Sequence, residues 1–141
     1  MSRVSDLVGN RELFTVQEDE TVSQVARRMS ELHVGAILVL KGTELRGVFS
    51  ERDLMRRVVL EKLDPERTPV RAVMSTELET IDSSDTVEAA MQAMLEKKCR
   101  HLPVLKEGRV AAFLSMRDLM SYELDSKTEE LSHIRAYLQN V

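Results

Sequence analysis

The sequence predicts an α/β protein of the α+β type, in which two β-α-β-β-α repeats pack with pseudo-twofold symmetry and a further helix follows them. The main observation is an internal repeat: a shift of 65 residues aligns residues 15–55 with residues 80–120 without a gap, and 13 of these 41 positions are identical. Average composition would give a match at about one position in fifteen to twenty. Two copies are too few for an open solenoid, so we expect them to pack on each other as one domain.

Length and composition agree with a single soluble globular domain. The chain has 141 residues, a formal net charge of -4 and 43% hydrophobic residues. A chain of this size can build its own core without disulfides or a structural metal. Cys99 is the single cysteine, so an internal disulfide is excluded and a reducing compartment is favoured. We expect the cytoplasm as the location and no metal site.

The sequence also argues against membrane, nucleic-acid and catalytic functions. The first twenty residues lack the apolar stretch of a signal peptide, and no run approaches the roughly 18 apolar residues that a membrane span needs. The mild acidity, without a long block of lysine or arginine, argues against binding of nucleic acid through phosphate neutralisation. No serine or cysteine nucleophile has a recognisable base nearby, so we expect no enzyme.

Each copy changes its hydrophobic period in the same order. In the first copy, Thr21 and Gln24 have the spacing of a capping box ahead of an amphipathic helix, and a second helix is expected to begin at Ser50. In the second copy, the corresponding helices are expected to begin at Thr86 and Ser115. The strands are expected at residues 14–16, 36–40, 45–49, 79–81, 103–105 and 110–114. Methionines at helical spacing are expected to fill gaps between the repeats: Met29, Met55, Met91, Met94 and Met120.

The chain divides into four segments. The first repeat covers residues 1–63, a connector with two prolines covers 64–69, the second repeat covers 70–124, and a C-terminal helix covers 125–141. The last helix is predicted from a second capping-box pattern at Ser126 and Glu129, followed by an apolar stripe at Leu131, Ile134 and Leu138. This helix either covers one end of its own domain or contributes to a dimer interface.

The most informative motif lies where the third strand of each copy meets the following helix. It reads Ser50-Glu51-Arg52-Asp53 in the first copy and Ser115-Met116-Arg117-Asp118 in the second. Free N–H groups and the helix dipole favour an anion at such a corner, and the serine hydroxyl and the arginine suit phosphate. The aspartate can accept hydrogen bonds from both hydroxyls of a ribose. The motif therefore has the parts of a ribose-phosphate site.

The same spacing also fits an ordinary helix N-terminus, with serine as the cap and aspartate in the first turn. A single copy would favour that structural interpretation. Two copies at matching places, each with the same arginine, favour the functional interpretation, although duplication copies a cap as readily as a site.

Together these features resemble the tandem cystathionine β-synthase (CBS) domains of a Bateman module. The resemblance covers residues 4–120 and is carried by the repeat order, by the two corners, and by residues 33–37 and 100–104 ahead of the second strand of each copy. Such modules bind adenine nucleotides (AMP, ADP, ATP, in some members NAD or S-adenosylmethionine) in clefts between the repeats.

The resemblance implies a set of site residues. Asp53 and Asp118 would hold the ribose. The phosphate-side residues would be Ser50, Arg52, Ser115, Arg117, Arg100 and His101. The adenine wall would be Val34, Gly35, Ala36, Ile37, Cys99, Leu102 and Pro103. For His101, a histidine satisfied at the start of a strand is an alternative. Ala112 replaces Gly47 and Arg100 replaces Gly35 between the copies, so the two sites are expected to differ, and occupancy of only one is plausible.

The expected function is a non-catalytic regulatory module that binds an adenine nucleotide between its repeats and signals through a conformational or dimer change. The expected partners are the nucleotide, a second copy of the chain and an effector protein. The alternative is a structural or protein-interaction module that has no ligand, in which the two corners are ordinary helix caps.

Overall fold

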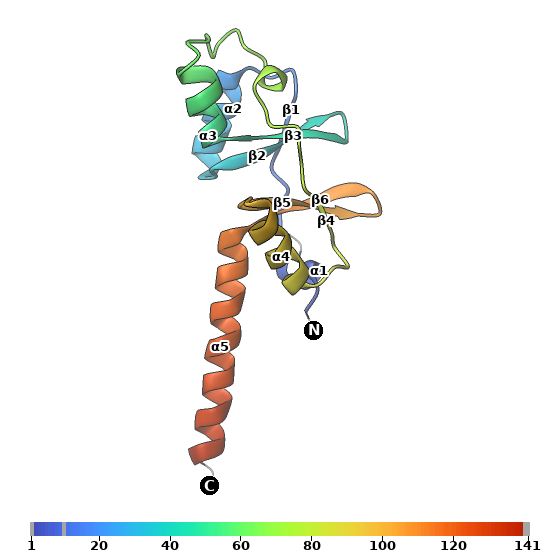
Figure 1. Cartoon of the computed structure of the whole chain (residues 1–141), viewed down its shortest axis with the longest axis vertical. Coiled ribbons are helices and arrows are strands. Elements are labelled where there is room, and N and C mark those ends of the chain that lie inside the picture. Colours follow the sequence, from blue (N-terminus) through green and yellow to red (C-terminus); the bar gives the residue numbers. More distant parts are fainter. Residues whose placement is uncertain (1, 10, 140–141) are drawn as a thin grey trace.

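The computed structural model describes residues 2–9 and 11–139, and it confirms a mixed α+β fold built from a repeated pair of units (Figure 1). The first half contains β1 (Thr15–Gln17), α2 (Val22–Leu32), β2 (Ala36–Lys41), β3 (Glu44–Ser50), α3 (Glu51–Asp53) and the π-helical turn η1 (Leu54–Val59). The second half contains β4 (Ile81–Asp82), α4 (Val87–Lys97), β5 (His101–Lys106), β6 (Arg109–Ser115) and α5 (Met116–Gln139). In each sheet the first strand pairs parallel with the second, which pairs antiparallel with the third.

The same local interactions begin and end the helices of both halves. The Thr21 hydroxyl accepts the Gln24 N–H at 3.2 Å, and the Gln24 side chain accepts the Thr21 N–H at 2.9 Å, so the capping box predicted there is confirmed. Thr86 caps α4 through its hydroxyl oxygen. Both helices end at a left-handed residue, His33 after α2 and Lys98 after α4, which are again 65 positions apart.

The segment that precedes the first strand of each copy packs in the opposite half. α1 (Val4–Val8) lies in the core of the second half, and the short 3-10 turn η2 (Val70–Ala72) lies in the core of the first. The first N–H of α1 donates to the Asp85 carbonyl and the first N–H of η2 donates to the Glu20 carbonyl, each at 2.8 Å. Each core therefore contains a segment that the sequence division assigns to the other repeat.

The two sheets lie between two outer groups of helices (Figure 1), and β3 and β6 contact each other across the centre of the molecule. Both strands show the same alternation of buried and less buried residues. Phe49 is fully buried in the core of the first half, and Leu114 is fully buried in the core of the second. The side chains on the other face of each sheet are thus left to meet between the repeats.

The C-terminal helix differs from the prediction. The expected start of a separate helix at Ser126 is wrong, because α5 is one continuous helix of 24 residues from Met116 to Gln139. Its first turns pack on the second half, where Leu119 is fully buried and the Tyr122 hydroxyl donates to the Ser2 hydroxyl. Its second half extends away from the body (Figure 1).

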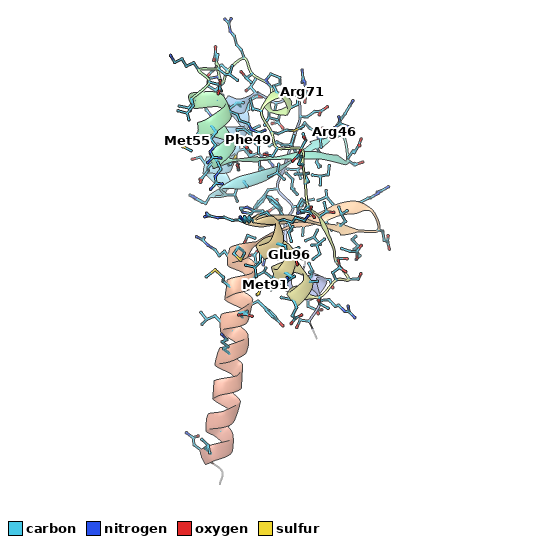
Figure 2. The ribbon with its side chains drawn as sticks, viewed as in Figure 1. Arg46, Phe49, Met55, Arg71, Met91 and Glu96 are labelled. Atoms are coloured by element: carbon cyan, nitrogen blue, oxygen red, sulfur yellow. The ribbon has the colours of Figure 1, made fainter. Side chains whose placement is uncertain are left out.

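The methionines divide between core and surface. Met29 and Met94 are buried in the two cores, whereas Met55 and Met120 are 50% and 65% exposed. Met55 lies on the outer side of η1 (Figure 2). Met91 packs, partly buried, against the second core. The methionines therefore lie within one core or on the surface, and the prediction that they fill gaps between the repeats is wrong.

Candidate functional site

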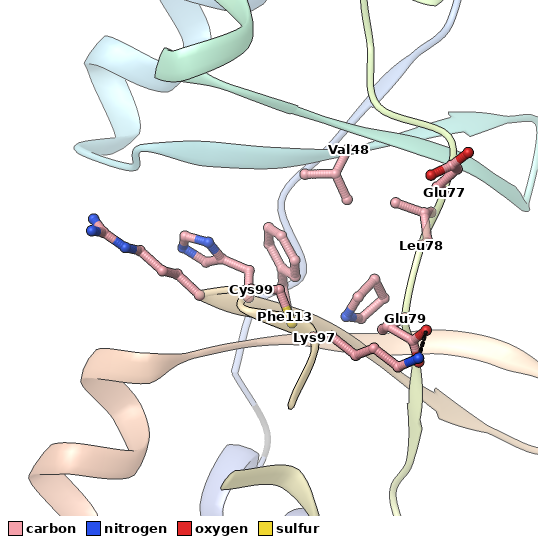
Figure 3. A pocket seen from close by; sticks show the side chains of 10 residues that line it. Val48, Glu77, Leu78, Glu79, Lys97, Cys99 and Phe113 are labelled. Carbon is pink, nitrogen blue, oxygen red and sulfur yellow. Dashed lines mark ion pairs between the residues drawn. The ribbon is translucent and has the colours of Figure 1, made fainter. Parts of the chain in front are cut away.

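A cleft of about 220 Å³ lies between the two sheets (Figure 3). Val48 of β3 and Phe113 of β6 line it, and these two residues are equivalent in the repeat. The other lining residues come from the end of α4, from the start of β5 and from the segment before β4: Lys97, Cys99, Arg100, His101, Pro103, Glu77, Leu78 and Glu79. The cleft is therefore built mainly from the second half and closed by the sheet of the first.

Strand alternation decides which predicted residues reach this cleft. His101 and Pro103 of β5 line it, whereas the intervening Leu102 is fully buried in the core of the second half. The His101 ring lies against the Phe113 ring, with centroids 5.0 Å apart and planes tilted by 32°. These rings and Pro103 give the cleft an apolar wall suited to a flat heterocycle.

The lining of the cleft carries charges of both signs. Arg100 and His101 come from the turn after α4 and the start of β5, whereas Glu77 and Glu79 lie along the segment before β4 (Figure 3). The Glu79 carboxylate forms an ion pair with Lys97 at 3.7 Å. An elongated ligand with a neutral ring and an anionic tail therefore has one favourable orientation, with the tail toward Arg100.

The cleft environment shifts the pKa values of two of its residues. Burial lowers the pKa of His101 below its usual value of 6.5, and Arg100 lowers it further, while Asp118 acts in the opposite direction. His101 is therefore neutral at pH 7 in the ligand-free protein. Burial raises the pKa of the Cys99 thiol, and the nearby Glu79 charge adds to this effect. Cys99 stays protonated at neutral pH, which is the state of an unreactive thiol.

The second corner joins this cleft through β5, since His101 pairs with Ser115 across the sheet. One Asp118 carboxylate oxygen accepts the Ser115 N–H at 2.8 Å, and the Ser115 hydroxyl accepts the Asp118 N–H at 3.1 Å. The other Asp118 oxygen pairs with Arg11 at 2.9 Å. Arg11 belongs to the segment between α1 and β1.

The first corner is more enclosed. Asp53 is 7% exposed, and one of its carboxylate oxygens accepts both the N–H and the hydroxyl of Ser50 at 3.0 Å. Its other oxygen accepts the Ser75 hydroxyl at 3.1 Å and lies 3.7 Å from Arg57. Both aspartates thus act as capping residues, and each is also held by a residue next to a segment that crosses between halves.

The remaining predicted residues divide into four groups. Cys99, Arg100, His101 and Pro103 lie together at the cleft. Ile37 and Leu102, which are repeat equivalents, lie in the two cores and not on a cleft wall, and Ala36 is buried beside Ile37. Three residues are exposed on the surface: Gly35, Arg52 and Arg117. Val34 is half-buried against the first core.

Several residues near the site carry no recognisable signal in the sequence. Glu77, Glu79 and Lys97 read as ordinary surface charges, and Arg11 lies outside the repeated segment. The aromatic wall offered one usable signal. Phe113 is the repeat equivalent of Val48 and precedes a buried strand residue by one position, which by alternation places it on the opposite face.

Among the residues that the structure describes, no helix combines the length and the apolar character needed to cross a membrane.

Comparison with known proteins finds one family model in both halves. The model described as "CBS domain" matches residues 4–60 and again residues 70–125. The CBS domain-containing protein CBSX3, mitochondrial, from Arabidopsis thaliana is 32% identical over 126 residues, which make up 86% of this chain and 61% of CBSX3. The chain therefore spans less than two thirds of that relative's length.

Solved structures share the fold over most of the chain. The crystal structure of the CBS domain NE2398 has a TM-score of 0.82 and 30% sequence identity, and the match covers 87% of this chain and 98% of that chain. The CBS domain protein PAE2072 from Pyrobaculum aerophilum, complexed with AMP, has a TM-score of 0.75 and 28% identity, covering 82% and 88% of the two chains.

Proposed function

The chain belongs to the CBS domain family and carries two CBS domains as a tandem Bateman module, and from this premise we propose that it is a non-catalytic regulatory module that binds an adenine nucleotide. The observation that carries the proposal is the cleft between the sheets, with an aromatic wall and basic side chains in its lining. The similar protein PAE2072 is described as complexed with AMP, which makes AMP the first candidate, followed by ADP, ATP and NAD.

In the proposed complex the adenine ring lies in the cleft against Phe113 and Pro103, and the ribose hydroxyls donate to Asp118. The phosphate lies toward Arg100 and the Ser115 hydroxyl, where the N-terminus of α5 and a guanidinium both favour an anion. Arg117, exposed on the first turn of α5, is a further phosphate donor. The neutral His101 ring can donate one N–H to the phosphate, and protonation would add a second N–H donor and a positive charge.

The charges around the two corners favour the second corner as the binding site for the nucleotide phosphate. The first corner has Glu51 where the second has Met116, and it has Gly35 and Ala36 where the second has Arg100 and His101. The Glu51 carboxylate lies over Gly35, with Oε2 3.4 Å from the position that a Cβ would take there. A phosphate at the first corner would meet this carboxylate, so we propose that the nucleotide occupies the second site.

Hydrogen-bonding capacity points to the same site. A carboxylate offers about four acceptor positions. Asp118 uses two of them, for the Ser115 N–H and for Arg11, which leaves two for a ribose diol. Asp53 already accepts three hydrogen bonds, from Ser50 twice and from Ser75, with Arg57 close by. A ribose at Asp53 would have to displace an existing donor.

The proposed output is a change in the arrangement of the two repeats or of a homodimer, passed to an effector protein. A ligand biases such an arrangement only by the difference in its affinity for the two states. Exposed apolar side chains on equivalent helices support a contact with a second copy: Met55, Val59, Leu60 and Met120 are each at least half exposed. The cytoplasm remains the proposed location, although the similar CBSX3 is described as mitochondrial.

A second candidate function is a protein-interaction module without a ligand. The observation that favours it is that both aspartates already serve as helix caps. In this case nucleotides would not bind, and replacing Asp53 or Asp118 would change only stability.

A thermal-shift screen of the purified chain with AMP, ADP, ATP, NAD, S-adenosylmethionine and GTP tests the proposal. A ligand at one hundred times its dissociation constant adds about 2.7 kcal/mol to the free energy of unfolding. For a chain of this size the melting temperature should then rise by about 5 to 10 °C. The proposal of a nucleotide-binding module is rejected if no adenine nucleotide raises the melting temperature and the purified protein carries no bound nucleotide.

A further inference from the structure

A heptad pattern runs along α5 from the body of the protein to the tip of the helix. The steps alternate between four and three residues, as at the a and d positions of a coiled coil: Met120, Leu124, Lys127, Leu131, Ile134 and Leu138. Five of these six residues are apolar. Met120, Leu124 and Leu138 are 65%, 67% and 65% exposed, whereas Leu119, on the side that packs against the second half, is fully buried.

The second half of α5 would be stabilised by a partner. Residues 126–139 extend beyond the body as a single helix (Figure 1). An isolated helix of about 12 to 15 residues is marginal in water even when it is rich in alanine. This segment instead contains two serines, a threonine, a histidine and a tyrosine, all weaker helix formers. Burial of its apolar stripe is the available source of the missing stability.

The charges beside the stripe match those of a second copy in parallel. With Leu124, Leu131 and Leu138 at a, Glu130 falls at g and Arg135 at the following e. In a parallel dimer, the g position of one helix faces the following e position of the other. Glu130 of each copy would then face Arg135 of the other copy, which gives two ion pairs of opposite charge. An antiparallel pair centred on Leu131 would instead place Glu130 against its own copy. The single polar d residue, Lys127, reaches solvent along its flexible stem.

We propose that α5 forms a parallel, in-register two-stranded coiled coil with α5 of a second copy. The stripe of six positions spans about 27 Å and starts beside the body at Met120. The coil supplies an interface of its own for the homodimer named under the proposed function. The argument for this interface holds whether or not the chain binds a nucleotide.

A charge-matched pair of double variants tests the interface in the full-length protein. Leu131→Lys with Leu138→Lys places two charges on the stripe. The control, Ser132→Lys with Gln139→Lys, places the same two charges at b positions, each one residue after a stripe position and away from the proposed interface. Sedimentation equilibrium should show a dimer dissociation constant at least tenfold higher than that of wild type for the stripe variant. For the control variant it should lie within about twofold of wild type. Equal dissociation constants for the two variants would overturn the proposal.

Disulfide trapping tests the parallel register. In a Cys99→Ser background, Leu131→Cys and Leu138→Cys should each give a covalent dimer under mild oxidation, because facing a positions fit disulfide geometry in a parallel pair. Ser132→Cys should not. An antiparallel helix pair can bring at most one of the two positions beside its own copy, so trapping at only one position, or at neither, rejects the proposed arrangement. The AMP-induced thermal shift, measured on the lysine variants, which retain Cys99, reports on nucleotide binding separately.

Discussion

The repeat supplies a matched pair of substitutions for assigning the nucleotide site, Asp118→Asn and Asp53→Asn. Asparagine keeps one oxygen for the capping N–H of Ser115 or Ser50, at 2.8 and 3.0 Å, so the helix starts should survive. It places an NH₂ group where the second carboxylate oxygen stood. At Asp118 the ribose hydroxyls would then lose a charged acceptor.

The expected magnitudes differ between the two variants. A hydrogen bond to a charged group contributes about 1.5 to 3 kcal/mol, so Asp118→Asn should weaken AMP binding by about 10- to 100-fold. Its stability should fall by about 1 kcal/mol or less, because the ion pair with Arg11 is partly exposed, at 19% for Asp118 and 45% for Arg11. Asp53→Asn should cost more stability, about 1 to 3 kcal/mol, because Asp53 is 7% exposed and bonds Ser50 and Ser75.

Isothermal titration calorimetry with AMP measures the first quantity, and chemical denaturation without AMP measures the second. The expected pattern is a large loss of affinity in Asp118→Asn and an AMP affinity within about twofold of wild type in Asp53→Asn. The opposite pattern would move the nucleotide to the first corner and refute the charge argument. If AMP binds and neither variant changes the affinity, the ribose assignment is wrong for both corners.

Three further predictions concern packing, pH and thiol chemistry. Gly47→Ala should destabilise the protein by about 1 to 3 kcal/mol, because the new Cβ would lie 2.7 Å from Met74 Sδ and 2.8 Å from the Ser75 carbonyl oxygen. Ala112→Gly, at the equivalent position, should cost less than about 1 kcal/mol in the same denaturation assay. Equal costs for the two variants would count against this packing argument. Because the folded state lowers the pKa of His101, its neutral form contributes stability that is present above pH 6.5 and is lost as the pH falls through the lowered pKa. The melting temperature of His101→Gln should therefore drop less between pH 7.5 and pH 5 than that of wild type, and an unchanged drop would contradict this linkage. Iodoacetamide should modify Cys99 at pH 7.5 more slowly than a free cysteine, since burial raises the pKa of the thiol. AMP should slow the reaction further. A rate that does not change at saturating AMP would argue against placing the adenine ring in the cleft.

The elements could be predicted from the sequence because their signals are local and appear twice. The capping box at Thr21 and Gln24 depends on two residues three apart, and the strands depend on short apolar runs bounded by turns. The packing of α1 in the second half and of η2 in the first could not be predicted, because no local sequence pattern indicates which core a short apolar segment enters. The repeat boundaries at residues 63 and 70 stay a prediction, close to the family matches at 4–60 and 70–125.

One error and one untested assignment can be explained physically from the chain itself. The capping-box pattern at Ser126 does not start a helix, because α5 is already helical through the ten residues before it, and serine is tolerated in a helix interior at a small cost. The resemblance implied that Ile37 and Leu102 form part of an adenine wall, and this stays a prediction. Strand alternation directs both side chains toward the cores, which leaves their backbone as the part available to a ligand, while their neighbour Pro103 lines the cleft.

The structure also explains how a ligand at one corner can act on the whole molecule. Asp118 pairs with Arg11, and the chain around Arg11 connects α1, which packs in the second half, to β1 in the sheet of the first. A nucleotide at the proposed site would therefore bind Asp118, whose ion-pair partner Arg11 lies on a segment that joins both halves. Its binding favours one arrangement of the halves only if the pairing of Asp118 with Arg11 differs between arrangements. Arg11→Gln should then change how strongly AMP alters dimer affinity, while AMP binding itself remains.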